Sequence, residues 1–85
     1  MEVKEAVQLA KRFIIDMFGD EQISNVGLEE VDFDSKNKVW YVTIGFSRPW
    51  DVGLPIVKPN RSYKVVRIKD AGGDVLSVKD REIPS

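Results

Sequence analysis

The chain is 85 residues long, carries a formal net charge of −1, and is 42% hydrophobic and 32% charged. This length predicts a single domain over residues 1–85, and the composition is that of a globular rather than a disordered chain. Cysteine and histidine are both absent, which excludes disulfides, cysteine-ligated metal sites and the commonest nucleophile–base pairs of enzymes. We therefore expect a protein that is not an enzyme and needs no cofactor.

Charge and hydropathy also restrict the partners. No apolar run approaches the ~20 residues of a membrane span, and residues 1–5 lack the basic end and apolar run of a secretory signal. Together with the missing cysteines, this predicts a cytoplasmic protein with no membrane partner. The near-neutral charge argues against a nucleic-acid partner. The charges are nevertheless segregated, with seven acids and no base in residues 16–34, and five bases and no acid in residues 52–69.

Apolar residues recur at steps of three and four through residues 2–18, which predicts an amphipathic helix. Gly19 is expected to end it, because glycine adopts the left-handed conformation at little cost. Ile15 falls well off the apolar stripe. The stripe is too wide and apolar to face solvent, so other elements must cover it. It consists of Val3, Ala6, Val7, Ala10, Phe13, Ile14, Met17 and Phe18.

Two predicted strands follow the helix. The first covers residues 26–33, and its apolar residues change phase half-way, which predicts a β-bulge or a bend near Glu29 and Glu30. A polar turn leads into the second strand, residues 39–47. This strand alternates clearly, and its face toward the helix carries Trp40, Val42, Ile44 and Phe46.

A third strand is predicted over residues 61–69, with Tyr63, Val65 and Arg67 on one side and Lys64, Val66 and Ile68 on the other. A turn over residues 70–74 supplies glycines where positive φ is needed, and the fourth strand, residues 75–79, points Leu76 and Val78 inward. We therefore predict an α+β fold in which one N-terminal helix packs on one face of a four-stranded antiparallel meander sheet.

Between the second and third strands lies a fourteen-residue loop, residues 47–60. Three prolines prevent a regular ladder there, yet the loop is rich in apolar side chains, Trp50 among them. Loops this long are uncommon inside compact domains and are often functional or disordered. Trp50 either closes the open end of the core or protrudes as an anchor for a partner, and the sequence leaves both readings open.

The order of these elements resembles that of PepSY-type domains, which are small modules of protease propeptides and envelope proteins. They share a helix-on-sheet layout with cystatin-like folds. The Pro49-Trp50 pair is similar to the Pro-Trp hairpin of cystatins, but here it does not lie in the last hairpin, and the Gln-x-Val-x-Gly hairpin of cystatins has no match. The resemblance implies the fold rather than inhibitory activity, and it is carried by Ala6 and Ala10 in the helix, Trp40-Tyr41-Val42, Tyr63 to Ile68, and the turn into Val75-Leu76.

No motif predicts a catalytic or metal site. Residues 32–37 begin like a calcium loop, but Lys36 stands at the fifth position and no glutamate stands at the twelfth. The neighbouring carboxylates of Glu30, Asp32 and Asp34 are typical of a solvated strand face that discourages edge-to-edge pairing.

Two surfaces remain as candidate binding sites, namely the loop at 48–57 and the sheet face away from the helix. We expect a non-enzymatic protein-interaction module, self-associating or inhibitory, whose partner is another protein or a second copy of the chain. The alternative is a nucleic-acid or anionic-ligand binder that uses Arg48, Arg61, Lys64 and Arg67. The predicted partner-binding residues are Arg48, Pro49, Trp50, Asp51, Leu54, Tyr41, Tyr63 and Arg67.

Overall fold

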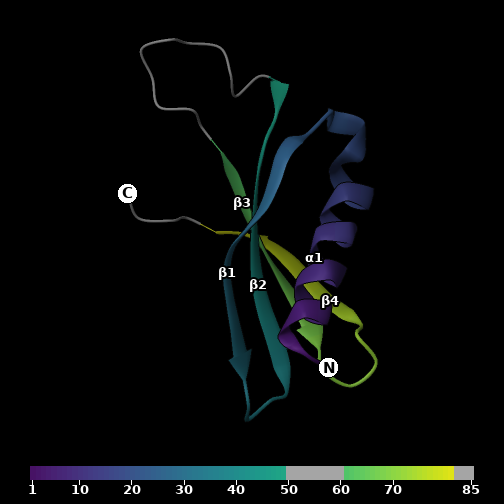
Figure 1. Cartoon of the computed structure of the whole chain (residues 1–85), viewed down its shortest axis with the longest axis vertical. Coiled ribbons are helices and arrows are strands. Elements are labelled where there is room, and N and C mark those ends of the chain that lie inside the picture. The colour runs from purple at the N-terminus through teal and green to yellow at the C-terminus, as the bar shows by residue number, and fades with distance from the viewer. Residues whose placement is uncertain (50–60, 82–85) are drawn as a thin grey trace.

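The computed structural model describes residues 1–49 and 61–81 (Figure 1). Helix α1 covers Val3–Phe18 and runs into a short 3-10 helix, Gly19–Glu21. Four strands follow, β1 (Ser24–Asp34), β2 (Val39–Ser47), β3 (Ser62–Lys69) and β4 (Val75–Asp80). They form one antiparallel sheet in the order β1-β2-β3-β4, with α1 on one face, so the predicted α+β fold is confirmed.

Helix α1 approaches the sheet closely because its innermost residues are small. Ala6 and Ala10 are fully buried, and so is Ile14. Ile15, predicted to lie off the stripe, is 49% exposed. The prediction for Gly19 is wrong in one respect: the α-helix does end there, but Gly19 stays right-handed, and the left-handed residue is Gln22 after the 3-10 turn, with φ of 54°.

The core lies between α1 and the central strands. The ring of Phe46 is fully buried and packs on that of Phe18, with 5.3 Å between their centroids. The alternation predicted for the second strand places its even-numbered residues under the helix, and β3 contributes alternate residues in the same way. The buried cluster is Ala6, Ala10, Ile14, Val42, Ile44, Phe46, Val66 and Ile68.

Strand β1 contains the predicted bulge. Leu28 pairs with Ile44 and Glu30 with Thr43, so Glu29 is the extra residue between them. The bulge lets the apolar residues before and after it face the same way, because one added residue reverses the alternation of a strand.

Strand β4 differs from the prediction. Its pairing with β3 shifts between Arg67 and Ile68, and the shift turns Val75 and Val78 toward the core. Leu76, predicted to point inward, is 46% exposed, because the irregularity at this point interrupts the alternation on which the prediction rested.

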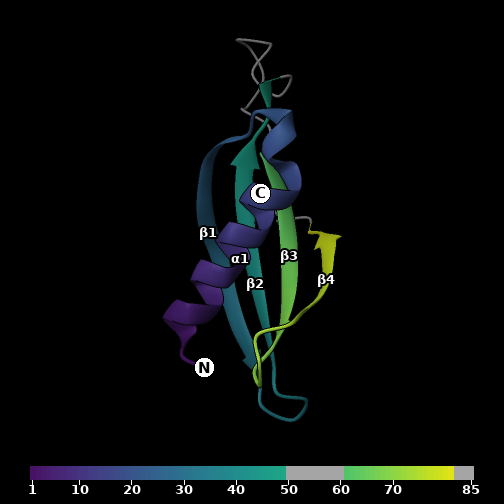
Figure 2. The same ribbon diagram turned by 90° about the vertical axis from the view of Figure 1, so that its right-hand side faces the viewer.

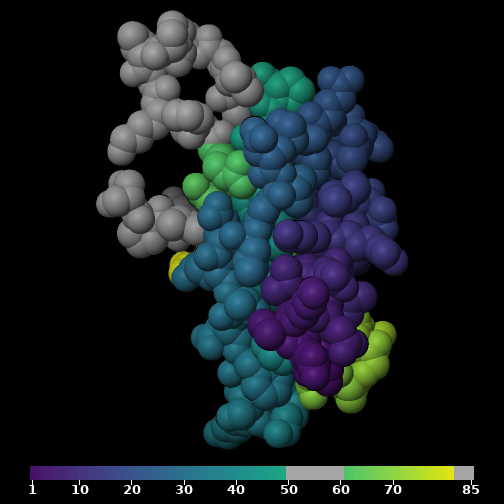
Figure 3. Space-filling model, viewed as in Figure 1, coloured from purple at the N-terminus to yellow at the C-terminus, as the bar shows by residue number. Residues whose placement is uncertain are grey.

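The turn between β3 and β4 packs beside the start of the helix, where Figure 3 shows its yellow-green atoms next to the purple ones. Gly72 and Gly73 have φ of 90° and 73°, as the prediction of positive φ required. A Cβ on Gly73 would lie 3.1 Å from Leu9, so the turn also needs glycine there for space. Asp70, at the start of the turn, accepts a hydrogen bond of 2.9 Å from the indole Nε1 of Trp40.

Ile14 and Ile15 provide a matched test of this packing. Replacing the fully buried Ile14 by alanine should lower the free energy of unfolding by about 2–5 kcal/mol, because it removes core contacts and leaves a cavity. Ile15→Ala removes the same atoms from a half-exposed position and should change the free energy of unfolding by less than about 0.5 kcal/mol. Urea denaturation measures both, and equal losses would contradict the assigned helix face.

Asp70 should make the stability depend on pH. The hydrogen bond from Trp40 lowers the pKa of Asp70 below its ordinary value, so the carboxylate stabilises the fold above the unfolded-state pKa and loses this effect as the pH falls through the folded-state pKa. We expect Asp70→Asn to be less stable than the native chain at pH 7, and the difference to shrink as the pH falls below about 4.

Urea denaturation at a series of pH values measures this difference. Asp16→Asn, an exposed change on α1, is the control and should follow the native pH dependence. If Asp70→Asn lowers the free energy of unfolding by the same amount at every pH down to 2, the charge of Asp70 does not contribute to stability.

Candidate functional site

The sheet face away from α1 has three zones, and we call it the open face. The two central strands carry two half-buried tyrosines, Tyr41 on β2 and Tyr63 on β3. On one side of them, β1 carries the acids Glu30 and Asp32. The other side is basic, because Arg67 on β3 is followed by the exposed Lys79 on β4. Among residues 1–49 and 61–81, Figure 1 shows no helix on this side of the sheet.

Arg67 is the least satisfied cation of the open face. Its guanidinium lies 5.9 Å from the ring centroid of Tyr41, and its Nη1 donates a long hydrogen bond of 3.5 Å to Ser77. Its Nε is buried without a hydrogen-bond partner, and no carboxylate of the described residues forms an ion pair with it. A buried donor left unpaired is costly, so a partner that supplies an acceptor here would gain affinity.

A second arginine of the open face, Arg61, forms an ion pair and a hydrogen bond within the chain. Arg61 Nε lies 3.6 Å from the carboxylate of Glu29, the bulge residue, and Arg61 Nη2 donates a hydrogen bond of 2.8 Å to the carbonyl of Asn25. The pair lies directly over Gly45, where an added Cβ would stand 2.9 Å from Arg61 Nη2 and 3.0 Å from Glu29. Gly45 therefore provides the space in which this ion pair covers the sheet.

Arg81 ties the end of the described chain back to the sheet. Its backbone N–H donates a hydrogen bond of 2.9 Å to the carbonyl of Tyr63, and its guanidinium reaches Glu30 of β1 at 3.1 Å. Beside it lies a hollow of about 310 Å³, lined by Glu30, Asp32, Tyr41, Thr43, Val65 and Arg81. The open face is thus a mixed surface, in which aromatic and aliphatic groups alternate with charges.

Arg48 lies elsewhere, at the end of the sheet near the helix C-terminus. Its Nε lies 2.5 Å from the carboxylate of Glu21, its Nη1 donates a hydrogen bond of 2.8 Å to Ser62, and its guanidinium lies 5.1 Å from the ring of Phe46. The structure thus separates Arg48 and the exposed Pro49 from the tyrosines of the open face. The predicted loop from residue 50 onward, with Trp50, Asp51 and Leu54, lies outside the described residues.

The cations of the alternative prediction are mostly paired. Lys64 forms an ion pair with Asp80 on the helix side of the sheet, and this pair lowers the pKa of the Asp80 carboxyl. Arg61 and Arg48 also have carboxylate partners, which leaves Arg67 as the exception. Cations that are neutralised in this way attract phosphates weakly.

Over the part of the chain that the structure describes, no group of three or more acidic side chains is placed to hold a metal ion. The carboxylate of Asp34, in the segment that begins like a calcium loop, instead accepts hydrogen bonds from the backbone N–H groups of Lys36 and Asn37 at 3.0 and 3.2 Å. The side-chain amide of Asn37 donates a third bond at 2.8 Å, and it lowers the pKa of Asp34 most. Across the same described ranges, no helix is long and apolar enough to span a membrane.

No model of a protein family, no curated protein and no solved structure matches this chain. The resemblance to PepSY-type and cystatin-like domains therefore stays a prediction. What the structure adds comes from its own geometry, and two residues that the sequence did not single out take part in it. Gly45 gave a usable signal, because a glycine inside a strand often marks a close approach of other groups. Arg81 gave none, since its pairing depends on register, and Glu29 was expected only as part of the bulge and not as a partner of Arg61.

Gly45 and its register partner Gly27 form a second matched pair. Gly45→Ala should lower the free energy of unfolding by about 1–3 kcal/mol, because the new methyl group must displace the Arg61–Glu29 ion pair. At Gly27 an added Cβ meets only Arg61 Nη2, at 3.9 Å, so Gly27→Ala should change it by less than about 1 kcal/mol. Urea denaturation compares the two, and an equal effect at both positions would argue against close packing over Gly45.

Proposed function

We propose that this chain is a non-enzymatic protein-interaction module whose open face pairs with a second copy of the chain. The observation that carries the proposal is the order of the zones on that face, acidic on β1, aromatic in the middle and basic on β3 and β4. A surface with this order is complementary to itself, because a half-turn about an axis along the strands places the β1 side of one copy over the β4 side of the other.

The unpaired charges fit this arrangement. Asp32 is exposed and forms no ion pair with any described residue, and the same holds for Lys79 on the opposite side of the sheet. In the two-fold arrangement Asp32 of each copy lies over the β3 and β4 side of the other copy, which carries Arg67 and Lys79. Complementary charges of this kind select the correct orientation of two partners more than they add affinity.

The tyrosines would supply most of the binding energy. Tyrosine is enriched at interface hot spots because its ring buries a large area while its hydroxyl stays hydrogen-bonded. Two sheets packed face to face keep their strands within about 30° of each other, a geometry that the antiparallel sheet can adopt.

The area of the open face sets the expected affinity of the dimer. Four strands about 4.8 Å apart and about eight residues long give a face of about 500 Å², below the about 800 Å² per partner of a standard stable interface. We therefore expect a weak dimer that forms at high protein concentration and dissociates on dilution.

Charge reversal on the open face tests the proposal. Asp32→Lys and Lys79→Glu should each raise the dimer dissociation constant about ten-fold, because each change occurs twice in a symmetric dimer and about 0.7 kcal/mol per contact then adds up to about 1.4 kcal/mol. The double variant carrying both changes should recover the native constant, since it restores opposite charges across the interface. Analytical ultracentrifugation over a range of concentrations measures all four proteins.

The control is Asp16→Lys, which reverses a charge on the outer side of α1 and should leave the dimer unchanged. Circular dichroism checks that every variant is folded. A native chain that stays monomeric at the highest concentration, or single variants that dimerise as the native chain does, would refute pairing through this face.

A further inference from the structure

Helix α1 leaves part of the sheet uncovered on its own side as well. It packs on β1, β2 and β3, and Figure 2 shows β4 standing beside it rather than beneath it. Between the C-terminal half of α1 and β4 runs a groove of about 300 Å³. It lies on the opposite side of the sheet from the open face and is independent of the proposed dimer.

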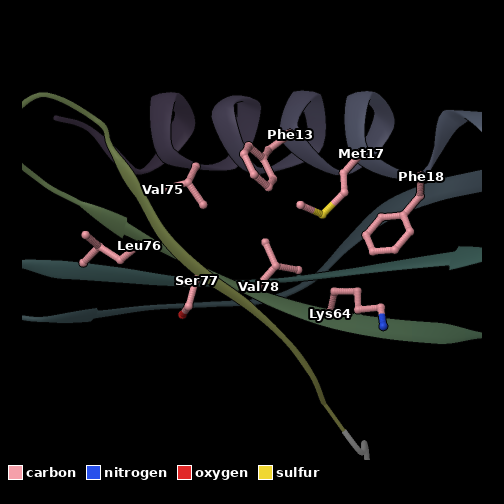
Figure 4. Close-up of a pocket in the computed structure, with 8 residues that line it drawn as sticks. All are labelled: Phe13, Met17, Phe18, Lys64, Val75, Leu76, Ser77 and Val78. Atoms are coloured by element: carbon pink, nitrogen blue, oxygen red, sulfur yellow. The ribbon is translucent and has the colours of Figure 1, made fainter.

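Most side chains that line the groove are apolar. Phe13, Met17 and Phe18 line it from the helix, and β4 contributes Val75, Leu76 and Val78 together with the polar Ser77. Figure 4 shows these side chains converging on the same space. Met17 is 52% exposed, although it belongs to the apolar stripe of the helix. A half-exposed thioether beside two half-buried aromatic rings is suited to an aliphatic ligand.

One end of the groove is basic. Lys64 lines it there, with its Nζ 5.3 Å from the ring centroid of Phe18, and Arg48 lies 5.5 Å from the same ring. In the structure the ammonium group of Lys64 forms an ion pair with Asp80, whose side chain is 85% exposed. A carboxylate is therefore the group that this end of the groove already accepts, and an exposed partner is one that a ligand can replace.

We propose that the groove binds a free medium-chain carboxylic acid, with its aliphatic tail against Met17 and Val78 and its carboxylate on Lys64 in place of Asp80. The volume of about 300 Å³ is at the lower end of the range for small-molecule sites and suits a small ligand such as octanoate. A ligand this small in an open groove should bind with a dissociation constant of about a millimolar.

Three ligands separate the contributions in a titration of the native protein followed by ¹H–¹⁵N NMR. Octanoate has both the tail and the charge, 1-octanol has the tail alone, and acetate has the charge alone. We expect octanoate to shift the amides of Met17, Ser77 and Val78 and to saturate, 1-octanol to bind at least five-fold more weakly, and acetate to cause no shift at the same concentration.

Two variants act in opposite directions. Lys64→Met keeps the length of the side chain and removes its charge, and should weaken octanoate binding to the level of 1-octanol. Asp80→Asn removes the competing carboxylate from an exposed position and should tighten octanoate binding at least two-fold. Lys36→Met, an exposed change in the turn between β1 and β2, is the matched control and should leave the affinity for octanoate unchanged.

Several results would overturn the proposal. Equal binding of octanoate and 1-octanol would remove the role of Lys64, and unchanged affinity in Asp80→Asn would do so even if Lys64→Met does not fold. Octanoate shifts confined to the open face would place the ligand elsewhere. Loss of self-association in Met17→Lys, measured by ultracentrifugation, would show that a second copy of the chain occupies the groove.

Discussion

One helix cannot cover a sheet of four strands, and both exposed surfaces of this molecule follow from that mismatch. A helix with its side chains is about 10 Å across, whereas four strands about 4.8 Å apart span about 19 Å. The buried alanines of α1 bring it close over the central strands, where Phe46 and Ile44 fill the core. What remains is one whole face of the sheet and, on the helix side, the strip beside β4.

The side chains on these two surfaces differ in character. On the open face, long arginine side chains lie across the sheet and reach acids of β1, so that aliphatic stems and ion pairs replace a second helix. On the helix side the gap is lined by aromatic and aliphatic groups, with charge only at its end. The first surface therefore suits a partner with its own charges in register, and the second suits a ligand that is apolar along most of its length.

Much of the fold could be read from the sequence because its signals are local. The helical stripe, the alternation of β2 and the glycine turn at residues 70–74 each depend on neighbours a few positions apart. The bulge in β1 left a visible change of phase, whereas the irregularity opposite Ile68 left none, and Leu76 was therefore placed on the wrong side. The open-face residues Tyr41, Tyr63 and Arg67 followed from alternation. The ion pair over Gly45 did not, because it depends on strand register and on the bulge, and the groove beside Met17 did not, because it depends on where the helix crosses the sheet.

The order of the strands has a consequence for how the molecule opens. Among the described residues, strand β4 pairs with β3 alone, and α1 does not lie across it. We therefore expect β4 to separate more readily than the central strands in transient, partial unfolding. Its departure would uncover the unpaired edge of β3 next to Val66 and Ile68, a short apolar strand of the kind that recruits other chains into aggregates. A ligand that binds against β4 would hold the strand in place and so reduce aggregation through the edge of β3.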